Sequence, residues 1–308
     1  MAAPLVIVGS LNMDVVCRVA RAPEAGETVL GGEVGFVPGG KGANQAVACA
    51  RLGGQVRMIG RVGDDAFGRR LRDGLALEGI DVGCVGIDAE AASGVAMILV
   101  EGNGQNRITV APGANAQLTP AHIAQAATTW PDAGWLLVQL ETPIDTVTAA
   151  LDAARRAGLR VILNPAPAPL QALPPSWWSC IDLLVPNEHE AASLTGIAAN
   201  GVQGARAAAR ALRQRGTPCV LVTLGAAGVL VSDAAGERLI PAPAVQVIDT
   251  TAAGDTFTGA LAVALSEGRP LDAAARFAVQ AAGLSVTRSG AQTSIPRRHE
   301  LGTNSSGD

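Results

Sequence analysis

Residues 135–164 read WLLVQLETPIDTVTAALDAARRAGLRVILN, in which two short apolar runs flank a longer amphipathic one. The apolar runs at 135–140 and 160–164 predict buried strands, and the spacing of apolar residues over 145–158 predicts a helix. Near-continuous apolar strands that alternate with helices indicate a mostly parallel sheet covered on both faces. This stretch therefore predicts an α/β fold.

The same alternation continues along the chain in both directions. Further strands are expected at 5–9, 56–62, 182–187, 219–224 and 228–232, and further helices at 42–53, 66–79, 119–129, 203–215, 255–267 and 271–287. In sheets of this kind, ligands bind beyond the carboxyl ends of the strands. We therefore expect the functional residues to follow directly after predicted strands.

Two stretches interrupt this alternation. Residues 12–38 contain short alternating segments separated by proline and glycine, and residues 94–111 read as two strands around a Gly-Asn-Gly turn. We expect the two stretches to form a small separate sheet that serves as a lid. The polar residues 302–308 are expected to form a frayed tail.

Composition excludes several classes of protein. Of the 308 residues, 48% are hydrophobic and 16% charged, which is enough apolar material for a sizeable core. A net charge of −4 without basic clusters argues against a nucleic-acid-binding surface. The five cysteines lack C-x-x-C spacing, which is typical of a reduced, cytoplasmic chain. We recognise no signal peptide, and no apolar run approaches the ~18 residues of a membrane span.

Three small residues precede an acid in DTTAAGDTFTGAL, residues 249–261. The Ala-Ala-Gly at 252–254 leaves backbone N–H groups uncovered where a helix over 255–267 begins, so this turn is a candidate anion site. Asp255 beside an anion site is explained if a hydroxyl between them loses its proton while it attacks a phosphoryl group. The alternative is that Asp255 only caps the helix.

Two further motifs carry side chains suited to a sugar. In GSLNMD, residues 9–14, Asn12 and Asp14 share a face and can bind adjacent hydroxyl groups. In PGGKGANQ, residues 38–45, the glycines permit close approach to a ligand, and the Asn44 amide can both donate and accept. The alternatives are an Asx turn and an ordinary glycine-rich turn before a helix.

Two motifs in the second half of the chain are suited to a nucleotide. Asn187 and Glu190 open a helix three residues apart, where they can organise Mg²⁺ through waters. The alternative is a capping box in which Glu190 reaches back. Small residues in TLGAAG, residues 223–228, leave a flat slot for a nucleotide.

In order and spacing, GSLNMD, GGKGANQAVA, QLETP, NPAPA, PNEHEA, TLGAAG and DTTAAGDTFTGAL resemble the ribokinase (PfkB) family of carbohydrate kinases, from about residue 5 to 296. The resemblance implies a doubly wound α/β domain (1–11, 39–93 and 112–308) with a β-sheet lid (12–38 and 94–111). It also implies ATP-dependent phosphorylation of the 5-hydroxyl of D-ribose, with Mg²⁺ and K⁺, and a homodimer formed through the lid. Phosphorylation of 2-deoxyribose or of another small sugar or nucleoside is an alternative, and a non-catalytic sugar-binding protein is a remote one.

The resemblance also implies roles for individual residues. Asp255 is the base, which we expect the helix N-terminus to keep ionised. The N–H groups of the anion hole are those of Ala252, Ala253 and Gly254. The sugar contacts are Asn12, Asp14, Gly40, Lys41, Asn44, Glu141 and Asp255, and Met13, Ala96 and Val110 shape the pocket around them. The nucleotide contacts are Asn187, Thr223, Leu224, Gly225, Ala226, Ala227, Gly228 and Gly254. Glu190 serves Mg²⁺ through water, and the K⁺ loop contains Asp249, Thr251, Ser285, Arg288, Gly290 and Ser294.

Overall fold

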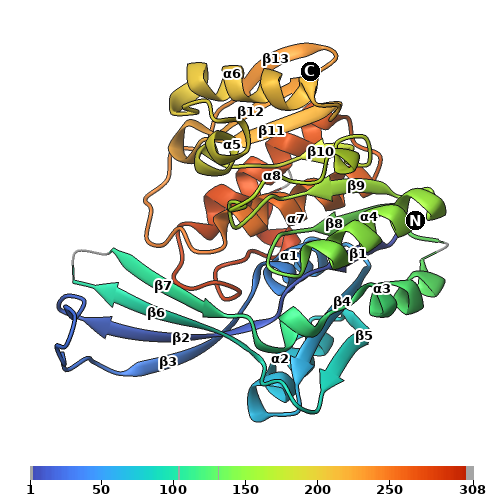
Figure 1. Ribbon diagram of the computed structural model, residues 1–308. Coiled ribbons are helices and arrows are strands. Elements are labelled where there is room, and N and C mark those ends of the chain that lie inside the picture. The colour runs from blue at the N-terminus through green and yellow to red at the C-terminus, as the bar shows by residue number, and fades with distance from the viewer. Residues whose placement is uncertain (1–2, 103–104, 131, 303–308) are drawn as a thin grey trace.

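The computed structural model describes residues 3–102, 105–130 and 132–302, which contain two sheets (Figure 1). The larger sheet has nine strands in the order β13-β12-β11-β10-β9-β8-β1-β4-β5. Its strands are β1 (Leu5–Val8), β4 (Val56–Gly63), β5 (Asp81–Asp88), β8 (Trp135–Val138), β9 (Arg160–Leu163), β10 (Leu183–Leu184), β11 (Cys219–Thr223), β12 (Val229–Asp233) and β13 (Gly236–Ile240). Pairing is parallel from β5 to β11 and antiparallel at β12 and β13, which confirms the predicted fold class.

Helices cover both faces of this sheet (Figure 1). On one face lie α1 (Lys41–Arg51), α2 (Ala66–Leu77), α7 (Ala253–Ser266) and α8 (Leu271–Ser285). On the other lie α3 (Pro120–Ala126), α4 (Ile144–Ala157), α5 (Glu188–Thr195) and α6 (Gly201–Gln214). In β1, Leu5 and Ile7 pack in the first core, and Val6 and Val8 in the second. Every residue of such a strand is buried, and its sequence is therefore continuously apolar.

Two strands were not predicted from the sequence, β5 and β13. Both are edge strands with partly exposed residues, so glycines and charges interrupt their apolar pattern. The strand expected at 182–187 is shorter than predicted, because Pro186 has no N–H to donate to a ladder. Among the described residues, no helix has both the length and the apolarity needed to cross a membrane.

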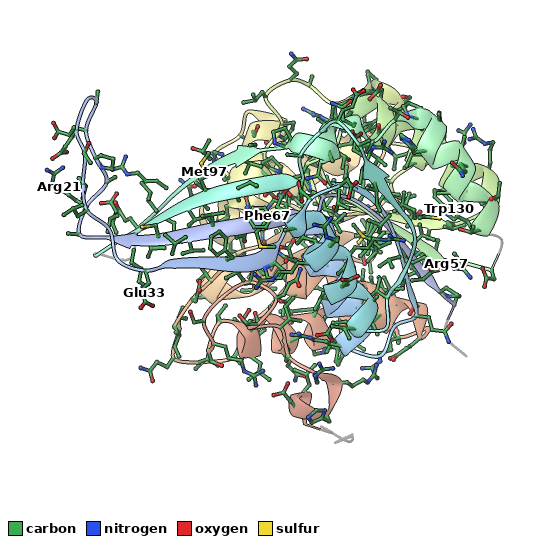
Figure 2. The ribbon with its side chains drawn as sticks, turned by 90° about the horizontal axis from the view of Figure 1, so that it is seen from below. Arg21, Glu33, Arg57, Phe67, Met97 and Trp130 are labelled. Carbon is green, nitrogen blue, oxygen red and sulfur yellow. The ribbon has the colours of Figure 1, made fainter. Side chains whose placement is uncertain are left out.

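The smaller sheet has four strands in the order β3-β2-β6-β7 and projects from the body (Figures 1 and 2). Its strands are β2 (Asn12–Val19), β3 (Val34–Gly39), β6 (Gly94–Glu101) and β7 (Asn106–Ala111). At its base, Phe36 of β3 stacks on Phe67 of α2 with 5.8 Å between ring centroids, and Arg70 of α2 donates to the Phe36 carbonyl. The predicted hairpin turn falls partly on residues 103–104, and most of the predicted tail on 303–308, which lie outside the described residues.

Candidate active site

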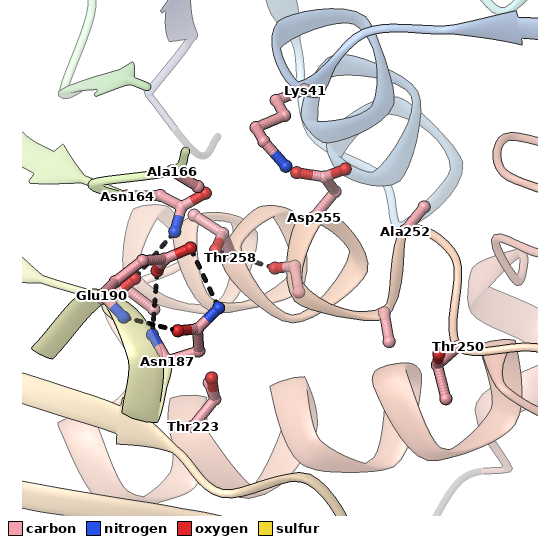
Figure 3. A pocket seen from close by; sticks show the side chains of 13 residues that line it. Lys41, Asn164, Ala166, Asn187, Glu190, Thr223, Thr250, Ala252, Asp255 and Thr258 are labelled. Atoms are coloured by element: carbon pink, nitrogen blue, oxygen red, sulfur yellow. Dashed lines mark hydrogen bonds between the residues drawn. The ribbon is translucent and has the colours of Figure 1, made fainter. Parts of the chain in front are cut away.

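A cavity of about 200 Å³ lies where β9, β10 and β11 end and α7 begins (Figure 3). Of the predicted site residues, those that line it are Lys41, Asn187, Glu190, Thr223, Ala252, Ala253, Gly254 and Asp255. Figure 3 shows Lys41 and Asp255 pointing toward one another, across the cavity from Asn187 and Glu190. The position agrees with the rule that ligands bind beyond the carboxyl ends of parallel strands.

Asp255 lies in the first turn of α7 and is buried against α1. Asn44 Nδ2 donates to Asp255 Oδ2 at 2.9 Å, and Gln45 Nε2 donates to Oδ1 at 3.1 Å. The two helices approach closely because Gly259 has no side chain, and a Cβ there would lie 2.6 Å from the Ala48 methyl group. The fold therefore joins two motifs that are 211 residues apart.

The pKa of Asp255 is raised by its burial, against the opposing effects of the Lys41 charge and of hydrogen bonds from Asn44 and Gln45. The expectation that the helix N-terminus keeps this carboxyl ionised implied a lowered pKa, and the direction of the shift is the opposite. Burial disfavours the charged form more than the surrounding donors favour it. A raised pKa makes the carboxylate a stronger base at neutral pH.

The turn before α7 has an uncommon backbone conformation. Ala252 has a φ of 58°, the one positive φ outside glycine among the described residues. The Ala253 N–H donates to the Thr250 carbonyl at 3.2 Å, so this predicted donor of the anion hole already has an acceptor. At Gly254 a Cβ would meet no atom within 4 Å, because this residue faces the open cavity.

Asn12 and Asp14 lie at the start of β2, where the smaller sheet leaves the body. Glycines make room for them: a Cβ at Gly39 would lie 2.4 Å from Asp14 Oδ2, and one at Gly94 would lie 2.2 Å from Asn12 Oδ1. The Asn115 Nδ2 donates to Asn12 Oδ1 at 2.8 Å and orients this amide. The two side chains thus have defined positions on one face of β2.

Strand register determines which lid residues share that face. Asp14 pairs with Ala96 and Ala96 with Val110, so these three residues lie on the same face of the smaller sheet. Met13 points to the opposite face and is fully buried in the core, so it does not share the face of Asp14. The expectation that Met13 shapes the same pocket was therefore wrong.

Gly40 and Lys41 form the turn into α1. Gly40 has a φ of 89°, and a Cβ there would lie 2.7 Å from the Asn12 backbone nitrogen. The Lys41 N–H donates to Glu141 Oε2 at 3.1 Å, and the Ser10 hydroxyl donates to the same oxygen. This carboxylate therefore connects the ends of β1 and β8 to the start of α1.

Carboxylates surround the one lysine. Burial lowers the pKa of Lys41, but the charges of Asp255, Glu141, Glu190 and Asp14 outweigh this effect and raise it. Burial, together with Glu141 and Asp255, raises the pKa of Asp14 to about 7. The site therefore has more buried acids than a single lysine can neutralise, an arrangement suited to proton transfer.

Asn187 and Glu190 form the capping box that the sequence left as an alternative. The Glu190 N–H donates to Asn187 Oδ1 at 2.8 Å, and the Asn187 N–H donates to Glu190 Oε2 at 2.9 Å. The Thr223 N–H donates to the Pro186 carbonyl at 2.9 Å, which places residues 223–228 beside this box. Burial raises the pKa of Glu190, whose carboxyl group lines the cavity.

The predicted cation loop is brought together in part. Asp249 Oδ1 accepts from the Thr251 N–H at 2.9 Å, and Asp249 Oδ2 accepts from the Gly290 N–H at 2.8 Å. The side chains of the other members donate elsewhere: Ser285 to the Ala282 carbonyl, Ser294 to the Ala291 carbonyl and Arg288 to Glu300. Within the described part of the chain, no group of three His, Cys, Asp or Glu residues could hold a metal ion.

Four amides near the site were not singled out from the sequence: Gln45, Asn115, Gln139 and Asn164. Gln45, Gln139 and Asn164 all lie within motifs quoted from the sequence, GGKGANQAVA, QLETP and NPAPA. The hydrogen-bond partners of Gln45 lie 94 to 210 residues away in the sequence, and no local pattern identifies them.

Comparisons with known proteins identify the class to which this fold and site belong. Residues 2–298 match the model described as pfkB family carbohydrate kinase. A ribokinase from Haemophilus influenzae is 43% identical over 296 residues, which cover 96% of both chains. A deoxyribokinase from Salmonella typhi is 37% identical over 292 residues, 95% of both chains. The structure of Arabidopsis thaliana ribokinase complexed with ribose and ATP matches with a TM-score of 0.88 and 34% identity, covering 98% of each chain. The chain belongs to the pfkB family of carbohydrate kinases.

Proposed function

We propose that the chain is a ribokinase, which transfers the γ-phosphoryl group of ATP to the 5-hydroxyl of D-ribose. The observation that carries the proposal is the buried pair of Asp255 and Asn44 at the start of α7. Asn44 donates to the carboxylate, while its buried Oδ1 has no hydrogen-bond partner among the described residues and is available to a sugar hydroxyl. The ribokinases among the relatives support ribose as the acceptor.

In this function Asp255 orients the 5-hydroxyl and accepts its proton as the oxygen attacks the phosphoryl group. Asn12, Asp14, Gly40, Lys41, Asn44 and Glu141 hold the sugar, and residues 252–254 stabilise the transferred group. Residues 223–228 and Asn187 bind the nucleotide. Because phosphoryl transfer involves little bonding to the attacking oxygen, positioning and charge stabilisation dominate its catalysis.

Two cations belong to the proposal. Glu190 fits Mg²⁺, because a single buried carboxylate facing the cavity, with waters and substrate phosphates, is the usual way this ion is held. When bound, Mg²⁺ neutralises charge on the phosphates. For K⁺ we propose the loop of Asp249, Thr251, Ser285, Arg288, Gly290 and Ser294. The hydrogen bonds that the Asp249 carboxylate accepts from the Thr251 and Gly290 N–H groups keep residues 249–251 beside residue 290. We also propose a cytoplasmic location.

The first experiment measures ADP release from ATP with D-ribose, 2-deoxy-D-ribose, D-fructose or adenosine, in K⁺ or in Na⁺. We expect turnover to be fastest with ribose and in K⁺, and slow without any sugar. Fastest turnover with 2-deoxyribose would keep the mechanism and overturn the choice of substrate, and equal rates in K⁺ and Na⁺ would overturn the cation loop. No turnover with any acceptor would favour the sugar-binding alternative.

We propose residues 12–38 and 94–111 as a lid whose closure excludes water from the cavity. The sheet of this lid exposes apolar side chains on both faces. Phe36 and Met97 flank Val15 on one face, Ile108 and Val110 lie on the other, and all of these side chains apart from Val15 are 44–57% exposed. Because exposed apolar faces of this kind mark interaction sites, we propose that two copies of the chain pair through their lids.

Ile108→Lys tests this pairing, because Ile108 is 57% exposed and the change leaves the core intact. We expect the wild-type protein to sediment as a dimer and the variant as a monomer in analytical ultracentrifugation. Leu77→Lys, at an 89% exposed apolar residue at the end of α2, is the control and is expected to remain dimeric. A wild-type monomer, or a dimeric Ile108→Lys protein, would contradict the proposal.

A further inference from the structure

A chain of buried amides leads from the end of β8 to Asp255. The Gln139 Nε2 donates to Gln45 Oε1 at 2.7 Å. The Gln45 Nε2 in turn donates to both Asp255 Oδ1 and Asn164 Oδ1, at 3.1 Å each. Gln45 and Gln139 have no exposed surface. Neither residue lines the cavity, so neither is placed to touch a substrate.

The partners of Gln45 allow only one orientation of its amide. The Asn164 Nδ2 donates to the Val185 carbonyl at 2.8 Å, so Asn164 presents its oxygen to Gln45. An ionised carboxylate also only accepts. The Gln45 NH₂ group must therefore face Asp255 and Asn164, and its oxygen must face the Gln139 NH₂ group. A flipped Gln45 amide would set oxygen against oxygen at Asp255 and Asn164, and one NH₂ group against another at Gln139.

The buried position of Gln139 leaves part of its amide without a hydrogen bond. Its Oε1 is buried and has no hydrogen-bond partner among the described residues. The side chain also packs so closely on Gly9 that a Cβ there would lie 2.1 Å from Gln139 Oε1. An unpaired buried acceptor is unfavourable for folding, so stability alone does not account for an amide here.

We propose that Gln45 is a positioning residue, which, with Gln139 behind it, holds the Asp255 carboxylate in the orientation that accepts the proton of the sugar hydroxyl. This inference rests on the proposed function. Asn44 donates to one carboxylate oxygen and Gln45 to the other, so the pair of adjacent amides determines the rotation of the carboxylate group. Loss of Gln45 leaves the group one partner and frees it to turn.

Gln45 also acts on the charge of this carboxylate. Its hydrogen bond lowers the pKa of Asp255, against the larger effect of burial, which raises it. The charged groups that face Asp255 are Lys41 of α1, Asp14 of β2, Glu141 after β8 and Glu190 of α5. Substitution of Gln45 or Gln139 removes none of these charges. A change in the pH dependence of kcat would therefore come from the loss of the amide hydrogen bonds.

The test compares Gln45→Met and Gln139→Met with the wild-type enzyme. For Gln45→Met we expect a kcat lower by about 10–100-fold, because small displacements of a catalytic group cost this much, and a KM for sugar within about threefold. The acid limb of the kcat–pH profile should move to higher pH. For Gln139→Met we expect a smaller decrease in kcat and a smaller movement of the acid limb in the same direction. In the double variant, the decrease in kcat should be smaller than the product of the two single decreases.

Thr146→Val is the matched control, because it removes a buried side-chain hydrogen bond to the Leu118 carbonyl away from the site. We expect it to lower the melting temperature and to leave the acid limb unmoved. The inference is overturned if the wild-type enzyme is active and both glutamine variants lose only thermal stability, as this control does. A wild-type protein without sugar-dependent turnover overturns the proposed function itself, a separate result.

Discussion

Asp255→Ala is expected to lower kcat by at least ~10²–10⁴-fold, the usual contribution of a general base, with little change in sugar affinity. The carboxylate is buried, its pKa is raised, and two amides hold it at the edge of the cavity. Steady-state kinetics with varied ribose measure kcat and KM separately. Because the other sugar contacts remain in place, the loss should fall on kcat.

Asp272→Ala supplies the control for that experiment. Asp272 is also an acid in the first turn of a helix, α8, but it pairs with Arg238 on the surface of the protein. Its removal is expected to leave kcat unchanged. An Asp255→Ala enzyme that keeps a tenth of the wild-type kcat would show that Asp255 is not the base.

Asp14→Asn is expected to weaken sugar binding and to stabilise the protein at pH 8. Burial and the neighbouring acids raise the pKa of Asp14 from 3.8 to about 7, so the folded protein binds this proton more tightly than the unfolded chain. The stability that this proton contributes is fully present below pH 3.8 and is lost as the pH rises through about 7. The two pKa values differ by an amount equivalent to about 4 kcal/mol, which is the order of the expected gain in unfolding free energy at pH 8.

Unfolding by urea between pH 4 and pH 8 measures this gain, which should be large at pH 8 and nearly absent at pH 4. The KM for ribose should rise by about 10–100-fold, because a hydrogen bond to a charged group contributes about 1.5–3 kcal/mol. Asp152→Asn, at an exposed position of α4, should change neither quantity. An Asp14→Asn protein no more stable than wild type at pH 8 would contradict the effect of burial on Asp14.

Much of the fold could be read from local patterns. In β1, side chains alternate between two cores, so every residue must be apolar and the strand is visible in the sequence. A glycine could also be interpreted from its local sequence. Gly40 has the positive φ that the turn into α1 requires, and its motif was predicted to lie close to a ligand. Asp255, Asn44 and Glu190 were likewise singled out from short motifs, because a strand end or a helix start places its side chains at a known edge of the sheet.

Other properties of the site depend on contacts that no local pattern contains. Nothing in the local sequence distinguishes Gln45 and Gln139 from other amides. Their hydrogen bonds to each other and to Asp255 form only because α1, the end of β8 and α7 pack together. The direction of the pKa shift of Asp255 was missed for the same reason, because desolvation depends on everything that covers the group. Periodicity along the chain records which side chains are buried, whereas hydrogen-bond partners and solvation are set by segments 94 to 211 residues away.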